Sequence, residues 1–176
     1  DLCDHVLPLL SPMETAATIA KRKAREKTGL PEEQIGCFFI TPCPAKVTDI
    51  RMPIGIGKSK VDGAIAISEI FPQLSHRMDK LSPEEVEPLS SSGIIGVSWA
   101  SSGGESSALL KEKYLAADGI ENVIRVLEEI EDERIGELDF IELNACSGGC
   151  VGGVLCVENP YVAIARLQRL RKYLPV

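Results

Sequence analysis

The chain has 176 residues, of which 44% are hydrophobic and 26% are charged, and its formal net charge is −7. This length and composition predict about one globular domain with a real apolar core. The acidic balance argues against nucleic acid or an anionic membrane surface as the main partner, because both favour a basic face. No apolar stretch approaches the roughly 20 residues that a membrane-crossing helix needs, and no signal peptide opens the sequence, so we expect a cytoplasmic protein.

The first helix signal lies near the start of the chain. Ser11 is a hydroxyl N-cap, Pro12 suits the first helical position and Glu14 supplies an early carboxylate. Gly29 then provides a stop signal, so the sequence predicts a helix over residues 12–28.

Short apolar runs rich in β-branched residues follow this helix. Such runs are typical of strands that are buried on both faces. Three of them are expected to be strands, namely 37–41, 63–68 and 93–99. A short helix is expected to open at residues 82–84, between the second and third of these strands. Surface loops are expected at 51–60 and 86–93.

The second half of the chain continues the alternation. Asp118 and Glu121 form a capping pair for an acidic helix whose apolar residues recur at helical spacing. These apolar residues are Ile120, Val123, Ile124, Leu127 and Ile130. A strand at 138–143 and a last helix from Tyr161 to Leu174 complete the order. The sequence therefore predicts an α/β fold with three layers and a mostly parallel sheet, which binds ligands beyond the carboxyl ends of its strands.

The segment ELNACSGGCVGG carries the strongest chemical signal. It places Cys146 and Cys150 around Gly148 and Gly149, and glycines let the backbone approach an inorganic cluster and aim N–H groups at its sulfurs. A second segment, FFITPCPAK, places Cys43 directly after a predicted strand. In a reducing compartment such cysteines indicate metal ligands rather than disulfides. Since both segments follow strands at their carboxyl ends, we expect the three thiols to converge on one metal cluster.

Three segments in order carry a family resemblance: FITPCPAKV, WASSGGESSALL and ELNACSGGCVGG. They resemble the second cysteine motif, the glycine-pair segment and the third cysteine motif of the iron-iron hydrogenase large subunit. LLSPMETAATIAKRK and VENPYVAIARL extend this resemblance over nearly the whole chain, which implies that residues 1–176 are part of that subunit's C-terminal domain and fold. The sequence is most similar to the sensory or regulatory branch, which is typically joined to ferredoxin-type cluster domains and a PAS sensor.

The resemblance implies a ligand set and a role for one lysine. Cys43, Cys146 and Cys150 match thiolate ligands of the H-cluster, a 4Fe-4S cubane joined to a two-iron site, and Cys150 matches the bridging thiolate. Lys46 matches the lysine that donates a charge-assisted hydrogen bond to a cyanide of the two-iron site. The implied activity is reversible reduction of protons to hydrogen, or hydrogen sensing, with ferredoxin-type domains or another carrier as the electron partner.

The sequence also departs from the family pattern. The first cysteine motif is absent and is expected before Asp1, so we expect a fragment that holds no complete cluster by itself. Thr41 and Asn144 stand at methionine positions of the family, and Met13 replaces a common glutamine. These changes alter polarity and packing around the two-iron site and imply slow catalysis or sensing. The expected cofactor-binding residues are Met13, Thr41, Pro42, Asn144, Gly148 and Gly149.

Other interpretations of the cysteines stay open. Cys146 and Cys150 could be buried thiols in a glycine turn. Zinc would need four ligands, often in closer pairs, and neither His5 nor His76 has ligand-like spacing. Cysteines in apolar or terminal settings are not expected to be ligands, namely Cys3, Cys37 and Cys156.

Several polar features also have a structural interpretation. Lys46 could be a solvated loop lysine, and Glu142 could be either a proton carrier or a hydrogen-bonded carboxylate at a strand end. Gly103 and Gly104 are expected to permit a tight turn rather than to cradle phosphate, and the acidic run 128–134 is expected to be a solvated helix face.

Two other functional classes remain as alternatives for the whole chain. One is a non-catalytic iron-sulfur protein of the cytosolic iron-sulfur assembly or prelamin-recognition type, which keeps a cubane and lacks the two-iron unit. The other is a signalling module whose cluster site is vestigial.

Overall fold

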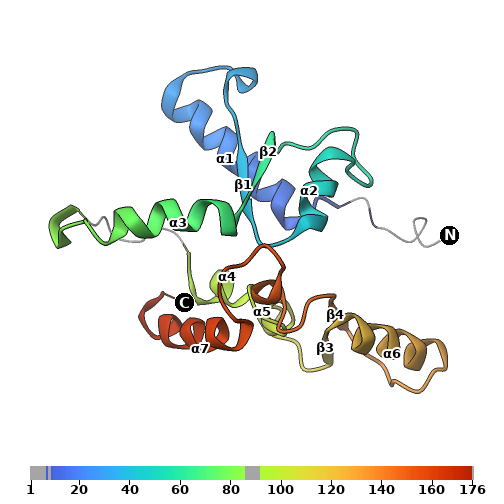
Figure 1. Cartoon of the computed structure of the whole chain (residues 1–176). Helices are drawn as coiled ribbons and strands as arrows, with labels where there is room; N and C mark the ends of the chain where they lie inside the picture. The colour runs from blue at the N-terminus through green and yellow to red at the C-terminus, as the bar shows by residue number, and fades with distance from the viewer. Residues whose placement is uncertain (1–6, 8, 86–91, 176) are drawn as a thin grey trace. The chain divides into compact units, whose positions relative to one another are not determined.

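The computed structural model describes residue 7 and residues 9–85 and 92–175. The chain divides into two compact units, residues 1–71 and 72–176, and Figure 1 labels the elements of each. The division falls inside helix α3 (Ile67–Met78), directly before Pro72. Proline has no backbone N–H, so Pro72 interrupts the hydrogen-bond ladder of this helix at the division. The prediction of a single partial domain over the whole chain stays a prediction.

Helix α1 (Pro12–Thr28) has the predicted bounds and the predicted caps. The N–H of Glu14 donates to Ser11 Oγ at 3.3 Å. Gly29 has a φ of 71°, and its N–H donates to the carbonyl of Arg25 at 2.8 Å. Both ends of the helix are therefore determined by local sequence signals.

The first unit contains one parallel strand pair. Strand β1 (Phe38–Thr41) pairs with β2 (Gly63–Ala66), so that Thr41 lies opposite Ala66. Helix α2 (Pro44–Arg51) and the 3-10 turn η2 (Glu32–Gln34) complete the unit together with the start of α3. The predicted strand at 37–41 is confirmed. The predicted strand at 63–68 ends early, because the Glu69 carboxylate accepts the N–H of Ala66 at 3.4 Å and helix α3 begins at Ile67.

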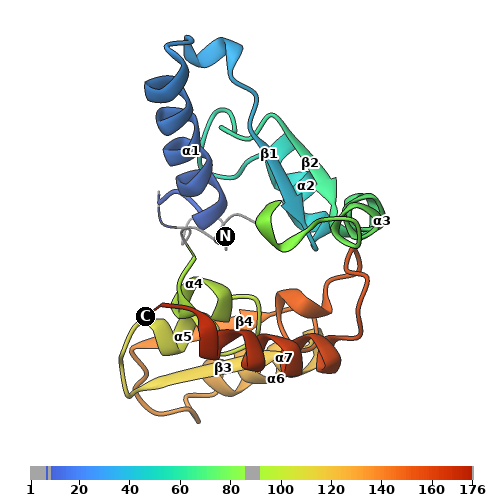
Figure 2. The same cartoon turned by 90° about the vertical axis from the view of Figure 1, so that its left-hand side faces the viewer.

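The core of the first unit lies between α1 and the strand pair. Its buried members are Met13, Ala17 and Val61. Cys37, Phe39 and Ile50 pack against them, and Figure 2 shows α1 along the side of β1 and β2. The spacing of Met13 and Ala17 on α1 explains why this face of the helix turns inward.

The second unit contains the other parallel strand pair. Strand β3 (Tyr114–Asp118) pairs with β4 (Phe140–Asn144), and Asp118 lies opposite Asn144 at the carboxyl ends of both. The helical elements of this unit are η3 (Pro83–Glu85), α4 (Ile94–Ser98), α5 (Gly104–Ala108), α6 (Ile120–Glu131), η4 (Cys150–Gly152), α7 (Pro160–Leu170) and η5 (Arg171–Tyr173). The α/β class and parallel strand pairing are thus confirmed, with the described strands arranged as two pairs.

One predicted strand is wrong. Residues 93–99 contain helix α4, in which the N–H of Val97 donates to the carbonyl of Gly93 at 3.1 Å. The hydroxyl of Ser98 also donates to the carbonyl of Ile94 at 2.6 Å, which satisfies one more helical acceptor. A short apolar run has no periodicity that separates a strand from a buried helix, so tertiary contacts decided this segment.

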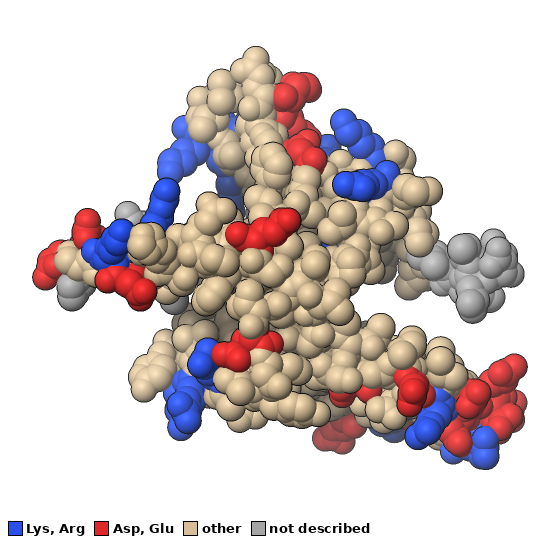
Figure 3. All heavy atoms as spheres, viewed as in Figure 1, with Lys and Arg blue, Asp and Glu red and all other residues tan. Residues whose placement is uncertain are grey.

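The predicted capping role of Asp118 is also wrong. Asp118 ends strand β3, which the sequence pattern did not predict, and α6 begins after Gly119, whose φ is 83°. The acidic run after Leu127 is exposed or half-buried as expected, and Figure 3 shows acidic and basic side chains together over α6. The 3-10 turn η3 confirms the short helix expected at 82–84, whereas most of the loop expected at 86–93 lies outside the described residues.

None of the helices in the described part of the chain is both long enough and apolar enough to cross a membrane.

A buried carboxylate joins α1 to the segment before β2. Glu14 is only 3% exposed, and its carboxylate accepts hydrogen bonds from Ser59 Oγ and from the N–H of Lys60, the latter at 2.8 Å. Ser59 Oγ in turn accepts the N–H of Val61 at 3.0 Å. This network satisfies polar groups of a chain segment that otherwise lacks regular structure.

Replacing this carboxylate should destabilise the chain. We expect Glu14→Ala to lower the free energy of unfolding by about 1–3 kcal/mol, because the buried hydroxyl of Ser59 and the half-buried N–H of Lys60 lose their acceptor. Urea unfolding followed by circular dichroism measures the change. The control Glu26→Ala removes an exposed carboxylate from the same helix and should change the free energy by less than about 0.5 kcal/mol. Equal midpoints for the two variants would contradict the role of Glu14.

Candidate metal centre

Cys43 lies two residues beyond the end of strand β1 and directly before the first residue of α2. The side chain of Thr41 is fully buried and forms hydrogen bonds with both backbone polar groups of Cys43. Its hydroxyl accepts the N–H of Cys43 at 3.0 Å and donates to the Cys43 carbonyl at 3.3 Å. Pro42, which lies between them, is half-buried. Thr41 therefore fixes the direction in which the Cys43 loop leaves the strand.

Two other residues expected at the cofactor lie in the same unit. Lys46 is half-buried in the first turn of α2, three residues after Cys43, and this spacing places both residues on one side of the helix start. Met13 is 5% exposed and packs in the apolar core with Ala17 and Val61. The roles of Lys46 and Met13 toward a cofactor stay predictions.

Cys146 lies two residues beyond the end of strand β4, in the position that Cys43 has after β1. The loop from Cys146 to Cys150 turns tightly, because the N–H of Gly149 donates to the Cys146 carbonyl at 3.1 Å. It is also tied to the connection between α4 and α5. The N–H of Ser102 donates to the Gly148 carbonyl at 3.0 Å, and the N–H of Val151 donates to the Ala100 carbonyl at 2.9 Å.

The two central glycines have backbone conformations that other residues avoid. Gly148 has a φ of 83°, and Gly149 has a φ of 85° with a ψ of −150°. A Cβ atom on Gly149 would lie 2.5 Å from the backbone nitrogen of Ser102. A glycine is thus required at position 149 because the backbone of residues 101–102 passes close to it. The sequence interpretation had explained this glycine only by the approach of a metal cluster.

A carboxylate from the neighbouring strand holds the same loop. The N–H of Gly148 donates to Asp118 Oδ2 at 2.6 Å. The sequence interpretation missed this contact because it placed Asp118 at a helix start. The run YLAAD before Gly119 was the available signal, since it reads as an apolar strand that ends in an acidic residue.

Glu142 is a satisfied structural carboxylate, as one of its two sequence interpretations proposed. It is 5% exposed and accepts hydrogen bonds from the N–H groups of Gly103 and Ser106, at 3.0 and 2.9 Å. The Ser106 hydroxyl donates at 3.0 Å and Asn144 Nδ2 donates at 2.8 Å. Burial alone would raise the pKa of Glu142, but the hydrogen bonds from Ser106, Asn144 and Gly103 outweigh it and lower the pKa below its ordinary value.

Of the other two described cysteines, Cys37 packs against the apolar core of the first unit, and Cys156 lies beside the Cys146–Cys150 loop. The expectation that neither is a ligand stays a prediction. Burial raises the pKa of the thiols of Cys37 and Cys156 above the ordinary cysteine value. Cys156 Sγ donates to the carbonyl of Cys150 at 3.5 Å. No disulfide joins any of the five cysteines in the described part of the chain, whereas Cys3 lies outside it.

The thiols offer a donor set suited to an iron cluster. Cys43 and Cys146 are half-buried and Cys150 is exposed, and thiolates are the ligands that iron-sulfur clusters use. Among the described residues no group of three or more Cys, His, Asp or Glu side chains lies close enough together to hold a metal ion. Cys43 belongs to the first unit and the other two thiols to the second, so their convergence stays a prediction.

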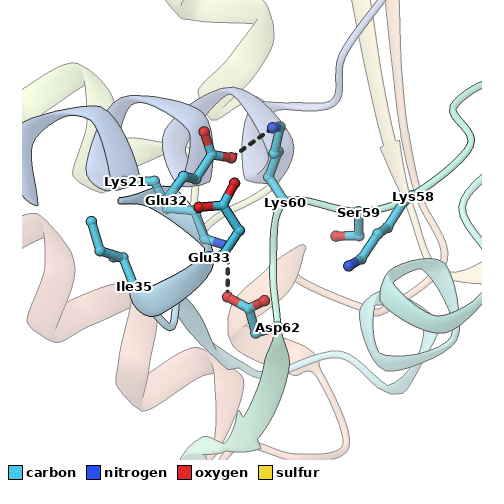
Figure 4. Close-up of a pocket in the computed structure, with 8 residues that line it drawn as sticks. All are labelled: Lys21, Glu32, Glu33, Ile35, Lys58, Ser59, Lys60 and Asp62. Carbon is cyan, nitrogen blue, oxygen red and sulfur yellow. Dashed lines mark hydrogen bonds and ion pairs between the residues drawn. The ribbon is translucent and has the colours of Figure 1, made fainter. Parts of the chain in front are cut away.

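A charged pocket of about 360 Å³ lies at the opposite end of β1 and β2 from Cys43. Figure 4 shows that its side chains pair with one another. Lys21 Nζ contacts Asp62 Oδ2 at 2.7 Å, and Lys60 Nζ contacts Glu32 Oε1 at 2.7 Å. The hydrogen bonds from Lys21 and from the Cys37 N–H lower the pKa of Asp62. We interpret this pocket as a structural ion-pair network at the amino ends of the strands.

The geometry of the cysteine loop can be tested through Gly149. We expect Gly149→Ala to lower the free energy of unfolding by about 2 kcal/mol or more, because the new Cβ would clash with backbone and adopt a conformation reserved for glycine. Thermal unfolding compares the stability of the variant with that of the wild-type chain. Gly136→Ala is the control, since a Cβ at Gly136 meets no heavy atom within 4 Å, and it should leave stability equal or slightly higher. A loss of similar size in both variants would show that the loop is not constrained as described.

The Glu142 network predicts a pH-dependent stability. A lowered pKa in the folded chain means that Glu142 stabilises it above the ordinary glutamate pKa of about 4.3 and loses this effect as pH falls through the lower folded value. The stability difference between the wild-type chain and Glu142→Gln should therefore be constant near neutral pH and shrink in acid. Urea unfolding at several pH values measures it. Glu137→Gln, whose side chain is 95% exposed, should show no such trend.

Comparison with known proteins identifies the family of the chain. The sequence matches the family model of the iron only hydrogenase large subunit, C-terminal domain, over residues 1–116 and 110–154. No curated protein gives a match. The family match includes Cys43, Cys146 and Cys150 and covers well over half of the chain. The chain belongs to the family of the C-terminal domain of the iron-only hydrogenase large subunit.

Proposed function

We propose that the chain supplies the thiolates of Cys43, Cys146 and Cys150 to the H-cluster of an iron-iron hydrogenase-like protein. The observation that carries this proposal is the equivalent placement of the ligand loops. Cys43 lies two residues beyond the end of strand β1, and Cys146 lies two residues beyond the end of strand β4. Membership of the hydrogenase family supports an iron cluster as the group that these thiols hold.

The chain's own residues have distinct roles in this proposal. The thiolates ligate iron, and Thr41 holds the Cys43 peptide so that its thiol leaves the strand in one direction. Lys46 offers an ammonium group on the same side of α2 as Cys43 and would donate to an anionic ligand of the two-iron site. When bound, the cluster supplies the redox chemistry for reversible proton reduction, while the protein supplies ligation, burial and polarity.

The polar residues at Thr41 and Asn144 favour a slow or sensory protein over a rapid hydrogen producer. The Thr41 hydroxyl binds the Cys43 backbone and Asn144 donates to Glu142, so neither position offers a thioether to a cofactor. We propose ferredoxin-type domains or an electron carrier as redox partners, with a PAS sensor as a further partner, in the cytoplasm. Hydrogen and protons would be the substrates or signals.

Iron binding tests the ligand set. We expect the chain to take up iron and sulfide under anaerobic conditions when a small thiol such as 2-mercaptoethanol is supplied for the remaining coordination position. Alanine at Cys43, Cys146 or Cys150 should each lower iron uptake several-fold, because a cubane with fewer thiolates is held poorly. Iron analysis and electron paramagnetic resonance give the readout.

The matched control is Cys37→Ala, which removes another half-buried thiol of the first unit and should leave iron uptake unchanged. Unchanged uptake in Cys43→Ala would instead contradict the convergence of the two units and favour a vestigial site.

The non-catalytic iron-sulfur class remains the alternative, since it would use the same scaffold. Infrared spectra of a longer protein that also carries the first cysteine motif, recorded after maturation, separate the two, because only the two-iron site carries cyanide and carbon monoxide. We expect both sets of bands. Cubane absorption without these bands would favour the assembly-type function, in which Lys46 has no anionic ligand to bind.

A further inference from the structure

The peptide of Gly148 is held at both of its polar groups. Its N–H donates to Asp118 Oδ2 at 2.6 Å, and its carbonyl accepts the N–H of Ser102 at 3.0 Å. Gly148 lies midway between Cys146 and Cys150. Two contacts from other parts of the second unit therefore determine how the loop presents both thiols.

Asp118 is itself fixed in place. It is the last residue of β3 and lies opposite Asn144 of β4, and Figures 1 and 2 both show these strands side by side. The N–H of Gly119 donates to the Asn144 carbonyl at 2.9 Å, and Asn122 Nδ2 donates to the Asp118 carbonyl at 2.9 Å. The carboxylate is thus aimed at the loop by the strand pair and by the first turn of α6.

We propose that Asp118 is a positioning residue that orients the Cys146–Cys150 loop and makes the reduction potential of its iron cluster more negative. This inference rests on the proposed function. A hydrogen bond from a neutral N–H to a carboxylate is among the stronger ones in proteins, so it orders the loop.

Two effects of Asp118 act on the potential in the same direction. Backbone N–H groups that donate to cluster sulfurs raise the potential, and Asp118 occupies the Gly148 N–H. Its negative charge, one hydrogen bond away from the loop, also opposes the addition of an electron to the cluster. The carboxylate thus favours the oxidised cluster.

The test separates position from charge. Asp118→Asn keeps an acceptor oxygen and removes the charge, whereas Asp118→Ala removes both. In the iron-free chain, the Gly148 amide should exchange with deuterium at least tenfold faster in Asp118→Ala, and less than threefold faster in Asp118→Asn. Nuclear magnetic resonance measures the exchange. An equal rate in the wild type and Asp118→Ala would overturn the positioning role.

The potential is measured on the iron-loaded chain by a redox titration followed by electron paramagnetic resonance. We expect Asp118→Asn to raise the reduced-to-oxidised ratio at least threefold at a fixed potential, which is about 28 mV at 59 mV per tenfold change. The control Asp139→Asn removes an exposed charge next to the opposite end of the same strand pair and should leave the midpoint unchanged. Equal midpoints in the wild type and Asp118→Asn would overturn the effect on potential. A wild-type chain that takes up no iron even when the small thiol is supplied would refute the proposed function, and the exchange rates would still decide the positioning role.

Discussion

Both cysteine loops depend on a side chain at the last residue of a parallel strand. Thr41 ends β1 and binds the backbone of Cys43, and Asp118 ends β3 and binds the backbone of Gly148. At the carboxyl end of a strand the ladder stops, and the next backbone groups need other partners. In this chain short polar side chains provide them. The same contacts that satisfy the backbone also fix the direction of each loop.

The second loop shows how far this dependence extends. Gly148 and Gly149 have positive φ values because the loop turns sharply against residues 100–102. Glu142 lies in strand β4. Its carboxylate accepts hydrogen bonds from backbone N–H groups at the start of α5 and from the side-chain amide of Asn144. Strand end, glycine loop and helix start are therefore joined by one connected set of backbone and side-chain hydrogen bonds. In the proposed function such support would pre-organise the loop for its cluster, which lowers the cost of binding.

The polar residues in this network also bear on function. Asn144, which the family resemblance places at a methionine position, donates from its amide to the buried carboxylate of Glu142. Thr41 likewise has a structural contact, because its hydroxyl accepts the N–H of Cys43. Both side chains therefore have structural roles in the chain. In the proposed function the same two residues also set the polarity beside the cluster.

Sequence reasoning succeeded where the signals were local. The caps of α1, the strand before Cys43 and the strand before Cys146 follow from residues within a few positions of each element. It failed at residues 93–99, where a short apolar run is compatible with both strand and helix, and the contact of Ile94 with the carbonyl of Pro175 lies far away in sequence. It also failed at Asp118, whose role depends on a strand pairing that no local pattern reveals.

The sequence by itself determined the family and the α/β class, because motif order and residue chemistry do not depend on long-range contacts. Tertiary structure decided which polar side chains hold the loops. The Asp118–Gly148 and Glu142–Ser106 contacts each join residues at least 30 positions apart. Such contacts arise only when strand pairing brings distant segments together, so their geometry could be known only from the folded chain.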